Sequence, residues 1–196
     1  MTIKKPQSLV MCILNVTPDS FSDGGQCFHI DDAISGAMRL LDQGADMIDI
    51  GGESTRPGAK SVDEVDEINR VVPVIQALSR QTKTPISIDT SKPKVMQQAV
   101  EAGASLINDV NALQADGALK MAASLEVDVC LMHRQGLPQT MQKNPTYNNV
   151  IEDIQHFFQQ RIDACERAGI PLDKIILDPG FGFGKTLAHN LEILRR

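Results

Sequence analysis

Asp89, Asn108 and Asp178 each end a short apolar run, and their side chains are well suited to bind a polar ring. A buried carboxylate accepts paired hydrogen bonds from an amino-amidine edge, whereas an asparagine side chain both donates and accepts. Together the three residues suit a flat heterocycle that carries N–H groups, such as a pterin or a guanine-like ring. Their spacing equally allows them to cap the helices that follow.

A second segment, residues 51 to 58, combines glycines, hydroxyl groups, a carboxylate and an arginine. Glycine lets the backbone approach a ligand closely, and the fork of Arg56 can pair with a carboxylate or a phosphate. An ordinary surface turn does not need this mixture, so we predict a loop that contacts a ligand.

The segment from Gly180 to Thr186 ends in Gly-Lys-Thr, as a phosphate-binding loop does. The full phosphate-loop pattern needs glycine where this chain has Pro179, and the dinucleotide pattern needs glycine where it has Lys185. We therefore predict a glycine-rich strand end that presents Phe183 to an aromatic pocket.

Asn15, Asp19 and Asp23 bring oxygen donors to the segment after the first apolar run. They could hold a hard cation such as Mg²⁺ beside a substrate phosphate, or they could satisfy the backbone of a turn. His133 is a candidate general base or a residue hydrogen-bonded in place. The order of residues indicates no Ser-His-Asp or Cys-His arrangement, which disfavours covalent catalysis.

Six apolar runs that end in Asn, Asp, Glu or His, each followed by an amphipathic stretch, must position these residues. The runs are Leu9 to Asn15, Met47 to Glu53, Ile86 to Asp89, Leu106 to Asp109, Val127 to His133 and Ile175 to Asp178. This alternation predicts parallel βα units with the helices outside, so that the strand ends share one rim. In the helix after the second run we expect Val65, Ile68, Val72 and Ile75 on the core face, with an interruption near Pro73.

The predicted fold class is α/β, a TIM-type (β/α)8 barrel with about six βα units in a single domain over residues 1–196. A closed barrel needs eight units and about 250 residues. The alternative is an open, doubly wound sheet. We favour a barrel without its C-terminal quarter, because the six polar strand ends suggest one rim.

The composition is that of a globular protein, with 42% apolar and 22% charged residues. A net charge of −6, 4% aromatic residues and no tryptophan argue against nucleic acid as a partner. The four cysteines are irregularly spaced, and no apolar stretch reaches transmembrane length. We predict a soluble cytoplasmic protein without a membrane partner.

These motifs together resemble dihydropteroate synthase, the folate-pathway enzyme that sulfonamides inhibit. The resemblance is carried by residues 13–25, 51–58, 87–90, 107–110, 131–133 and 178–185. It implies that (7,8-dihydropterin-6-yl)methyl diphosphate condenses with p-aminobenzoate to give dihydropteroate and diphosphate. Asp89, Asn108 and Asp178 would then hold the pterin, Thr55 would contact the diphosphate substrate, and Asn15 would bind Mg²⁺, the expected cofactor.

The resemblance also implies that two loops close over the p-aminobenzoate site. One contains Phe21 and Asp23 and the other contains Arg56 and Pro57, while Phe183 lines the site. Phe21, Asp23 and Arg56 are thus the candidate catalytic residues. The family further implies small-molecule substrates and a possible homodimer.

Two departures from the family pattern stand out. A Ser-Arg-Lys motif and an Arg-Val-His segment, which the resemblance assigns to the seventh and eighth strands, do not occur in this sequence, and Arg134 stands where Met is usual. The cations of those motifs would serve the pterin and the diphosphate. An alternative function is therefore a non-catalytic or methyltransferase-like pterin-binding module.

Overall fold

The structure is a computed structural model that describes residues 8–17, 30–54, 61–136 and 141–196. Strands and helices alternate along these residues. The elements are β1 (Met11–Asn15), α1 (Ile30–Asp42), β2 (Met47–Gly51), α2 (Glu64–Ser79), β3 (Ile86–Asp89), α3 (Pro93–Ala102), β4 (Leu106–Asp109), α4 (Ala118–Leu125), β5 (Asp128–Met132), α5 (Val150–Ala168), the 3₁₀ turn η1 (Leu172–Lys174), β6 (Ile175–Asp178) and α6 (Leu187–Arg195). All six predicted strands are present, and their predicted bounds are within two residues of the observed ones.

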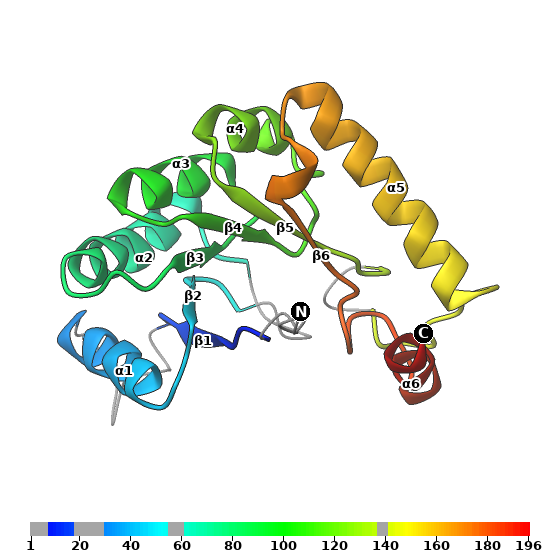
Figure 1. Cartoon of the computed structure of the whole chain (residues 1–196), viewed down its shortest axis with the longest axis horizontal. Coiled ribbons are helices and arrows are strands. Elements are labelled where there is room, and N and C mark those ends of the chain that lie inside the picture. The colour runs from blue at the N-terminus through cyan, green and yellow to red at the C-terminus, as the bar shows by residue number, and fades with distance from the viewer. Residues whose placement is uncertain (1–7, 18–29, 55–60, 137–140) are drawn as a thin grey trace, which may run out of the picture.

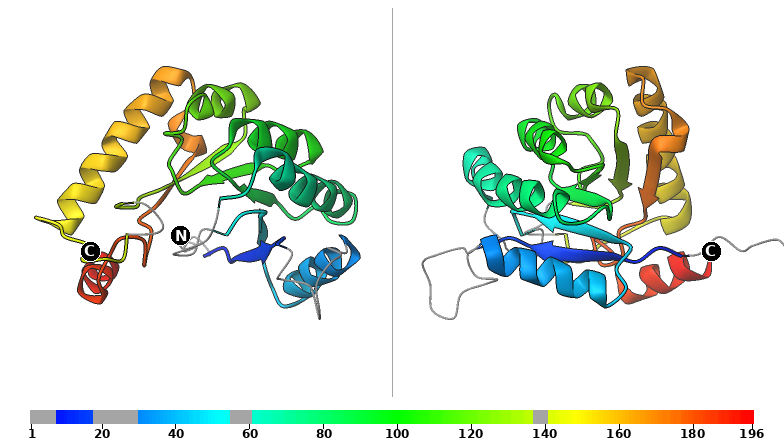
Figure 2. Two further views of the ribbon diagram at one scale, coloured as in Figure 1. Left: turned by 180° about the vertical axis from the view of Figure 1, so that it is seen from behind. Right: turned by 60° about the vertical axis from the view of Figure 1, so that its left-hand side comes forward.

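The six strands form one parallel sheet in chain order, from β1 to β6. They lie along an arc with α1 to α5 on its outer side (Figures 1 and 2). A doubly wound sheet would reverse its strand order and carry helices on both faces. This alternative is therefore wrong, and the six predicted βα units are confirmed. In the described part of the chain, β1 and β6 form the two ends of the sheet; the single domain over 1–196 stays a prediction.

The outer face of the sheet packs against the helices and forms the main core. Alternate residues of each strand point to this face, since side chains alternate along a strand. The largest fully buried members of the core include Ile48, Ile50, Ile75, Leu78, Ile88, Met96, Ile107 and Leu131. The intervening strand residues point to the inner, concave face, where Asp49, Ser87 and Asn108 lie.

Helix α2 differs from its prediction in two ways. It runs without interruption through Pro73, and Asn69, whose carbonyl would accept a hydrogen bond from an N–H at position 73, lies on the exposed side. Val65, expected in the core, is 60% exposed, and the buried residues include Glu67 and Val71 instead. The predicted Ile75 is fully buried, and Ile68 and Val72 pack partly buried against the core, so the period-3.6 pattern was correct and the centre of the core face lies about a quarter turn away.

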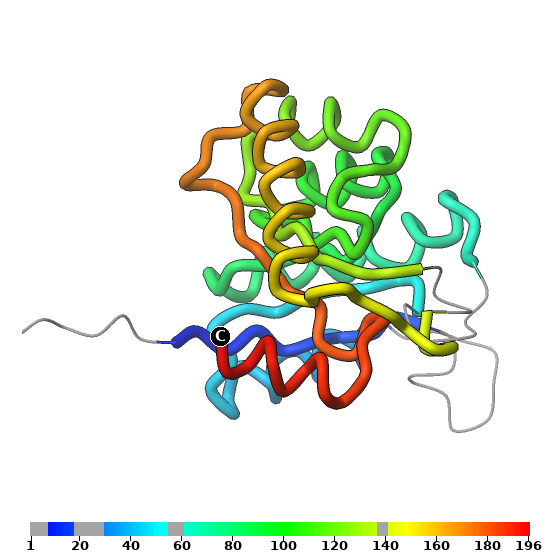
Figure 3. Tube along the Cα trace, turned by 90° about the vertical axis from the view of Figure 1, so that its right-hand side faces the viewer, coloured from blue at the N-terminus to red at the C-terminus, as the bar shows by residue number. Residues whose placement is uncertain are grey.

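Helix α6 packs against α5 beyond β6 (Figure 3). None of its residues is buried in the described structure. Among the described helices, none is both long enough and apolar enough to cross a membrane.

Candidate functional site

The strand ends on the inner face bring four predicted site residues to one rim. Asn15 is aligned with Gly51, Gly51 with Asp89, and Asp89 with Asn108. Residues aligned across parallel strands point to the same face, so Asn15, Asp89 and Asn108 share it. Asp178 reaches the same face, because it is aligned with Met132, two residues beyond the Cys130 that is aligned with Asn108.

Asp49 joins this group, although the sequence analysis did not single it out. It is only 3% exposed and lies two residues before the end of β2. Its Oδ2 accepts a hydrogen bond of 2.9 Å from Nδ2 of Asn108, which fixes the orientation of the Asn108 amide. Burial raises the pKa of Asp49, and the Ser87 hydroxyl and then this bond oppose the rise. An Asp inside the apolar run 47–50 was the signal that could have revealed it.

The carboxylates of the inner face act on one another electrostatically. Burial, reinforced by the negative charges of Asp49 and Asp109, raises the pKa of Asp89 well above its ordinary value. Burial and the charges of Asp178, Asp49 and Asp89 raise the pKa of the Cys130 thiol to about 12. The thiol is therefore neutral rather than a thiolate nucleophile.

Asp49 and Ser87 are aligned on neighbouring strands, and both side chains are buried. The Ser87 hydroxyl opposes the rise in the pKa of Asp49, although neither Oδ1 of Asp49 nor Oγ of Ser87 has a hydrogen bond of good geometry in the described part of the chain. The inner face is therefore lined with polar groups.

The segment that leaves β2 is held by two helices. Lys92 Nζ donates to the carboxylates of both Glu53 and Glu67, and Arg70 donates to the Gly52 carbonyl at 2.9 Å. A Cβ at Gly52 would lie 2.8 Å from Cγ1 of Val71, so only glycine allows this close packing. These contacts fix the chain at the point from which it continues to Thr55.

The glycine-rich segment after β6 is a compact loop against the end of β5. The backbone N–H of Gly180 donates to Oδ1 of Asp178 at 2.8 Å, and Phe183 is half-buried. Lys185 is buried, so its ammonium does not face solvent as a phosphate-binding lysine would. Thr186, rather than Asp178, caps α6.

The helix-cap interpretation of the trio is wrong. Helix α3 begins after Lys92 and α4 after Gly117, so Asp89 and Asn108 cap neither. Asp109, on the opposite face of β4, instead accepts hydrogen bonds from the segment that follows its strand. It accepts from the Ser91 hydroxyl and, at 2.8 Å each, from the N–H groups of Asn111 and Leu113.

His133 is hydrogen-bonded in place and does not face the inner rim as a base. Its Nδ1 lies 3.0 Å from Lys185 Nζ, and its ring meets Phe157 edge-on at a centroid distance of 4.9 Å. Burial, and next the Lys185 charge, lower the pKa of His133 to about 4.

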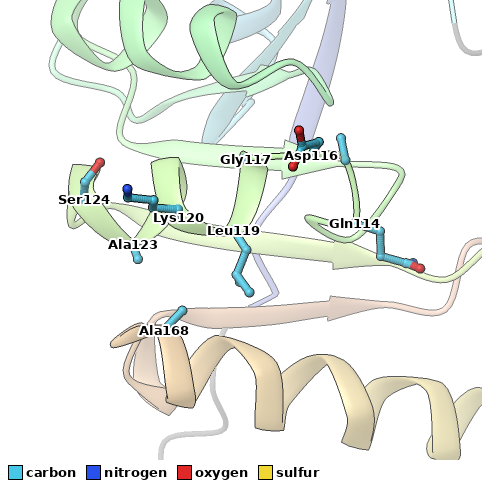
Figure 4. Close-up of a pocket in the computed structure, with 9 residues that line it drawn as sticks. Gln114, Asp116, Gly117, Leu119, Lys120, Ala123, Ser124 and Ala168 are labelled. Carbon is cyan, nitrogen blue, oxygen red and sulfur yellow. The ribbon is translucent and has the colours of Figure 1, made fainter.

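A surface hollow of about 780 Å³ lies away from these residues. It is formed along α4 and the segment before it, with Ala168 of α5 on its far side (Figure 4). It shares no residue with the rim of strand ends.

Five of the predicted site residues lie outside the described residues. They are Phe21, Asp23, Thr55, Arg56 and Pro57. Among the described residues, no group of three or more His, Cys, Asp or Glu side chains could hold a metal ion.

The chain is similar to known proteins along most of its length. A family model described as "Pterin binding enzyme" matches residues 11–196. Dihydropteroate synthase of Escherichia coli (strain K12) is 50% identical over 187 residues, which are 95% of this chain and 66% of that protein. The chain thus spans about two thirds of the length of this relative.

Solved structures agree with this similarity. The Yersinia pestis dihydropteroate synthase in complex with a sulfonamide drug has a TM-score of 0.90 at 54% identity, and the match covers 95% of this chain and 68% of that chain. The Xanthomonas albilineans enzyme with 4-aminobenzoic acid has a TM-score of 0.90 at 49% identity, covering 97% and 68%. The latter enzyme in complex with 7,8-dihydropteroate has a TM-score of 0.86 at 44% identity, covering 97% and 67%. These matches confirm the predicted barrel-type α/β fold.

Proposed function

This chain belongs to the family of pterin binding enzymes, and we propose that it carries the dihydropteroate synthase site. The reaction would join (7,8-dihydropterin-6-yl)methyl diphosphate to p-aminobenzoate and release diphosphate. The observation that carries the proposal is the alignment of Asp89, Asn108 and Asp178 on one inner face, in a chain 50% identical to a dihydropteroate synthase.

The inner face suits the pterin ring. Its carboxylates accept hydrogen bonds from ring N–H and amino groups, and Asn108, oriented by Asp49, supplies an amide. The buried oxygens of Asp49 and Ser87, aligned on neighbouring strands, add polar groups that a heterocycle or its bound water can contact. An acidic surface of this kind does not suit a bare diphosphate, so a cation is expected there.

Mg²⁺ is the proposed cofactor, with Asn15 as a ligand. Around the position that a Gly51 Cβ would occupy, Asp89 Oδ2 lies at 3.5 Å and Asn15 Oδ1 at 3.8 Å. Amide and carboxylate oxygens fit a hard cation that takes one or two protein ligands and completes its shell with phosphate and water. When bound, Mg²⁺ would neutralise diphosphate charge and improve it as a leaving group.

The reaction needs no protein nucleophile. The C–O bond to diphosphate breaks, the arylamine nitrogen forms a C–N bond at the same CH₂ carbon, and the amine loses a proton. Negative side chains around the ring stabilise the positive charge that develops at this carbon. The neutral Cys130 thiol and the occupied His133 are consistent with this route.

The p-aminobenzoate site is proposed from Phe21, Asp23, Arg56 and Pro57, with Phe183 as its wall. Asn15 of the inner rim and Ser54 precede the two loops in the chain, within six and two residues of Phe21 and Arg56, and this supports the proposal. A homodimer and a cytoplasmic location also stay proposals. The exposed leucines of α6, Leu187, Leu191 and Leu194, supply apolar surface that a second copy could cover.

The test is product formation by this chain with both substrates and Mg²⁺, measured as released diphosphate and as dihydropteroate. Ligand-binding measurements distinguish the synthase from the alternative, a non-catalytic pterin-binding module. For a synthase, p-aminobenzoate binding requires diphosphate and Mg²⁺, whereas a non-catalytic pterin-binding module binds pterin whether or not they are present. Asn15→Ala should weaken Mg²⁺-dependent diphosphate binding about tenfold and leave pterin binding without Mg²⁺ unchanged.

A further inference from the structure

Lys185 is a buried lysine whose ammonium is shared between two loops. It is 3% exposed and lies between the end of β5 and the glycine-rich loop that follows β6. Nζ lies 3.0 Å from Nδ1 of His133 and 3.2 Å from the His133 carbonyl oxygen. It also lies 3.0 Å from the carbonyl oxygen of Gly180 and 3.1 Å from that of Phe183. Four acceptors thus surround a group with three protons.

The two loops approach each other too closely for side chains. A Cβ at Gly180 would collide with the His133 carbonyl, and one at Gly184 with the Gln135 carbonyl. Both glycines have positive φ, +66° and +64°. This packing points the negative ends of three carbonyl dipoles at one place, where they repel each other unless a cation lies between them. The ammonium of Lys185 occupies that place.

The glycine-rich loop that follows β6 contacts or contains two residues of the proposed site, Asp178 at the end of β6 and Phe183 in the loop itself. Gly180 donates its N–H to Oδ1 of Asp178 and gives its carbonyl to Lys185, so one residue connects the ammonium to the pterin-binding carboxylate. The carbonyl of Phe183 binds the ammonium directly. A shift of this loop would therefore move both Asp178 and the Phe183 ring.

We propose that Lys185 is a positioning residue that locks the loop 179–184 against the end of β5 and thereby places Asp178 for the pterin and Phe183 for p-aminobenzoate. This inference rests on the proposed function. It gives the Gly-Lys-Thr sequence a role other than phosphate binding, since the lysine binds backbone carbonyls of its own chain.

The first experiment compares Lys185→Met with Lys174→Met by fluorescence titration of 6-hydroxymethylpterin. Lys174 is the matched control, because its Nζ also donates to a backbone carbonyl, that of Glu126, but it precedes β6 rather than following it. We expect the pterin Kd of Lys185→Met to rise about tenfold or more and that of Lys174→Met to stay within about twofold of wild type. Titrations are made well below each unfolding midpoint, so that folded protein is measured.

Chemical rescue separates positioning from stability. In Lys185→Ala, propylammonium supplies the missing carbons and the ammonium, whereas tetramethylammonium supplies charge without N–H donors. We expect propylammonium alone to restore pterin affinity. Rescue of folding by propylammonium without recovery of affinity, or a wild-type Kd in Lys185→Met, would overturn the inference. Failure of the wild-type chain to bind pterin would instead refute the proposed function.

Discussion

At the scale of single residues, burial of the Asp89 carboxylate lowers the stability of the fold and at the same time provides an acceptor for the proposed pterin. Because its pKa is raised, the folded chain binds its proton more tightly than the unfolded chain does. The unfolding free energy therefore falls as pH rises from the ordinary value of 3.8 through the raised one, and at neutral pH the folded state bears this cost. We expect Asp89→Asn to raise the unfolding free energy at pH 7, because the amide removes this cost. The same change should weaken pterin binding about tenfold or more, since charge-assisted hydrogen bonds are lost. Urea denaturation and titration with pterin measure the two effects.

Asp109 provides the control for Asp89, since it is also a buried carboxylate at a strand end. Its oxygens already accept from Ser91, Asn111 and Leu113. In Asp109→Asn an amide nitrogen would face one of these donors, so stability should fall by about 1–3 kcal/mol while pterin affinity stays near wild type. Equal loss of pterin affinity in both variants would contradict the separate roles of the two faces of β4.

The lowered pKa of His133 predicts that the unfolding free energy depends on pH. Its pKa falls from 6.5 to about 4 on folding, so between these values the unfolded chain binds the proton and the folded chain does not. The unfolding free energy therefore falls as pH drops from 6.5 to 4. At about 1.4 kcal/mol per pH unit, the contribution is on the order of 3 kcal/mol. His133→Asn cannot take this proton, so the stability advantage of wild type over this variant should shrink as the solution is acidified. Parallel stability curves for the two proteins, measured by urea denaturation at several pH values, would argue against a neutral buried imidazole.

At the scale of elements, the start of α3 secures the loop that leaves β2. The Glu67 side chain is 1% exposed and depends on Lys92 for its positive partner. Lys92→Met leaves this charge buried without a cation, so we expect a loss of about 3–5 kcal/mol of unfolding free energy. Lys94→Met, two residues later, removes an exposed 3.7 Å pair with Glu64 and should cost at most about 1 kcal/mol.

The double variant Lys92→Met with Glu67→Gln tests whether the unpaired Glu67 carboxylate causes the stability loss of Lys92→Met. Removing the buried charge together with its partner should recover part of the stability, as measured by thermal unfolding. If the double variant were no more stable than Lys92→Met, lost packing of the lysine stem rather than the unpaired carboxylate would explain the effect.

The elements show which parts of the molecule the sequence could reveal. The strands were predictable because each is an apolar run that ends in a polar residue, and their parallel order placed Asp89, Asn108 and Asp178 on one rim. Asp49, Glu67 and Lys185 were not predicted as buried groups. Their burial depends on partners far away in the chain, such as Asn108 for Asp49 and His133 for Lys185. Local periodicity contains no information about such partners.

The side of α2 that faces the core could also not be predicted from the local pattern of apolar residues. Val65 is as apolar as Val71, yet Val65 is exposed, whereas Val71 is buried against Gly52 at the end of β2. A contact of this kind depends on a loop at the end of another strand, which the 3.6-residue period of the helix cannot report.

At the scale of the whole molecule, the residues that stabilise the fold and the residues of the proposed site lie on opposite faces of the curved sheet. Helices cover its outer side (Figure 1), and the core side chains lie between them and the sheet, whereas Asp49, Asp89 and Asn108 lie on the inner face. Substitutions on the outer face should therefore act mainly through folding, and those at the inner strand ends mainly through ligand binding.

The unpaired edges of the described sheet, β1 and β6, favour association of this chain with other copies. In the described residues, β1 and β6 each pair on one side only, and both expose apolar side chains, among them Ile13 at 66% and Ile176 at 45%. Unpaired edges with apolar residues favour association with other chains, and charged residues on an edge strand oppose it. We expect this chain to self-associate at micromolar concentration, and Ile13→Lys combined with Ile176→Lys to shift it toward monomer in sedimentation velocity. Val65→Lys combined with Leu172→Lys adds the same two charges at sites in α2 and η1 that are 60% and 58% exposed, and it should leave the distribution unchanged. An equal shift in both proteins would mean that net charge, rather than the strand edges, controls association.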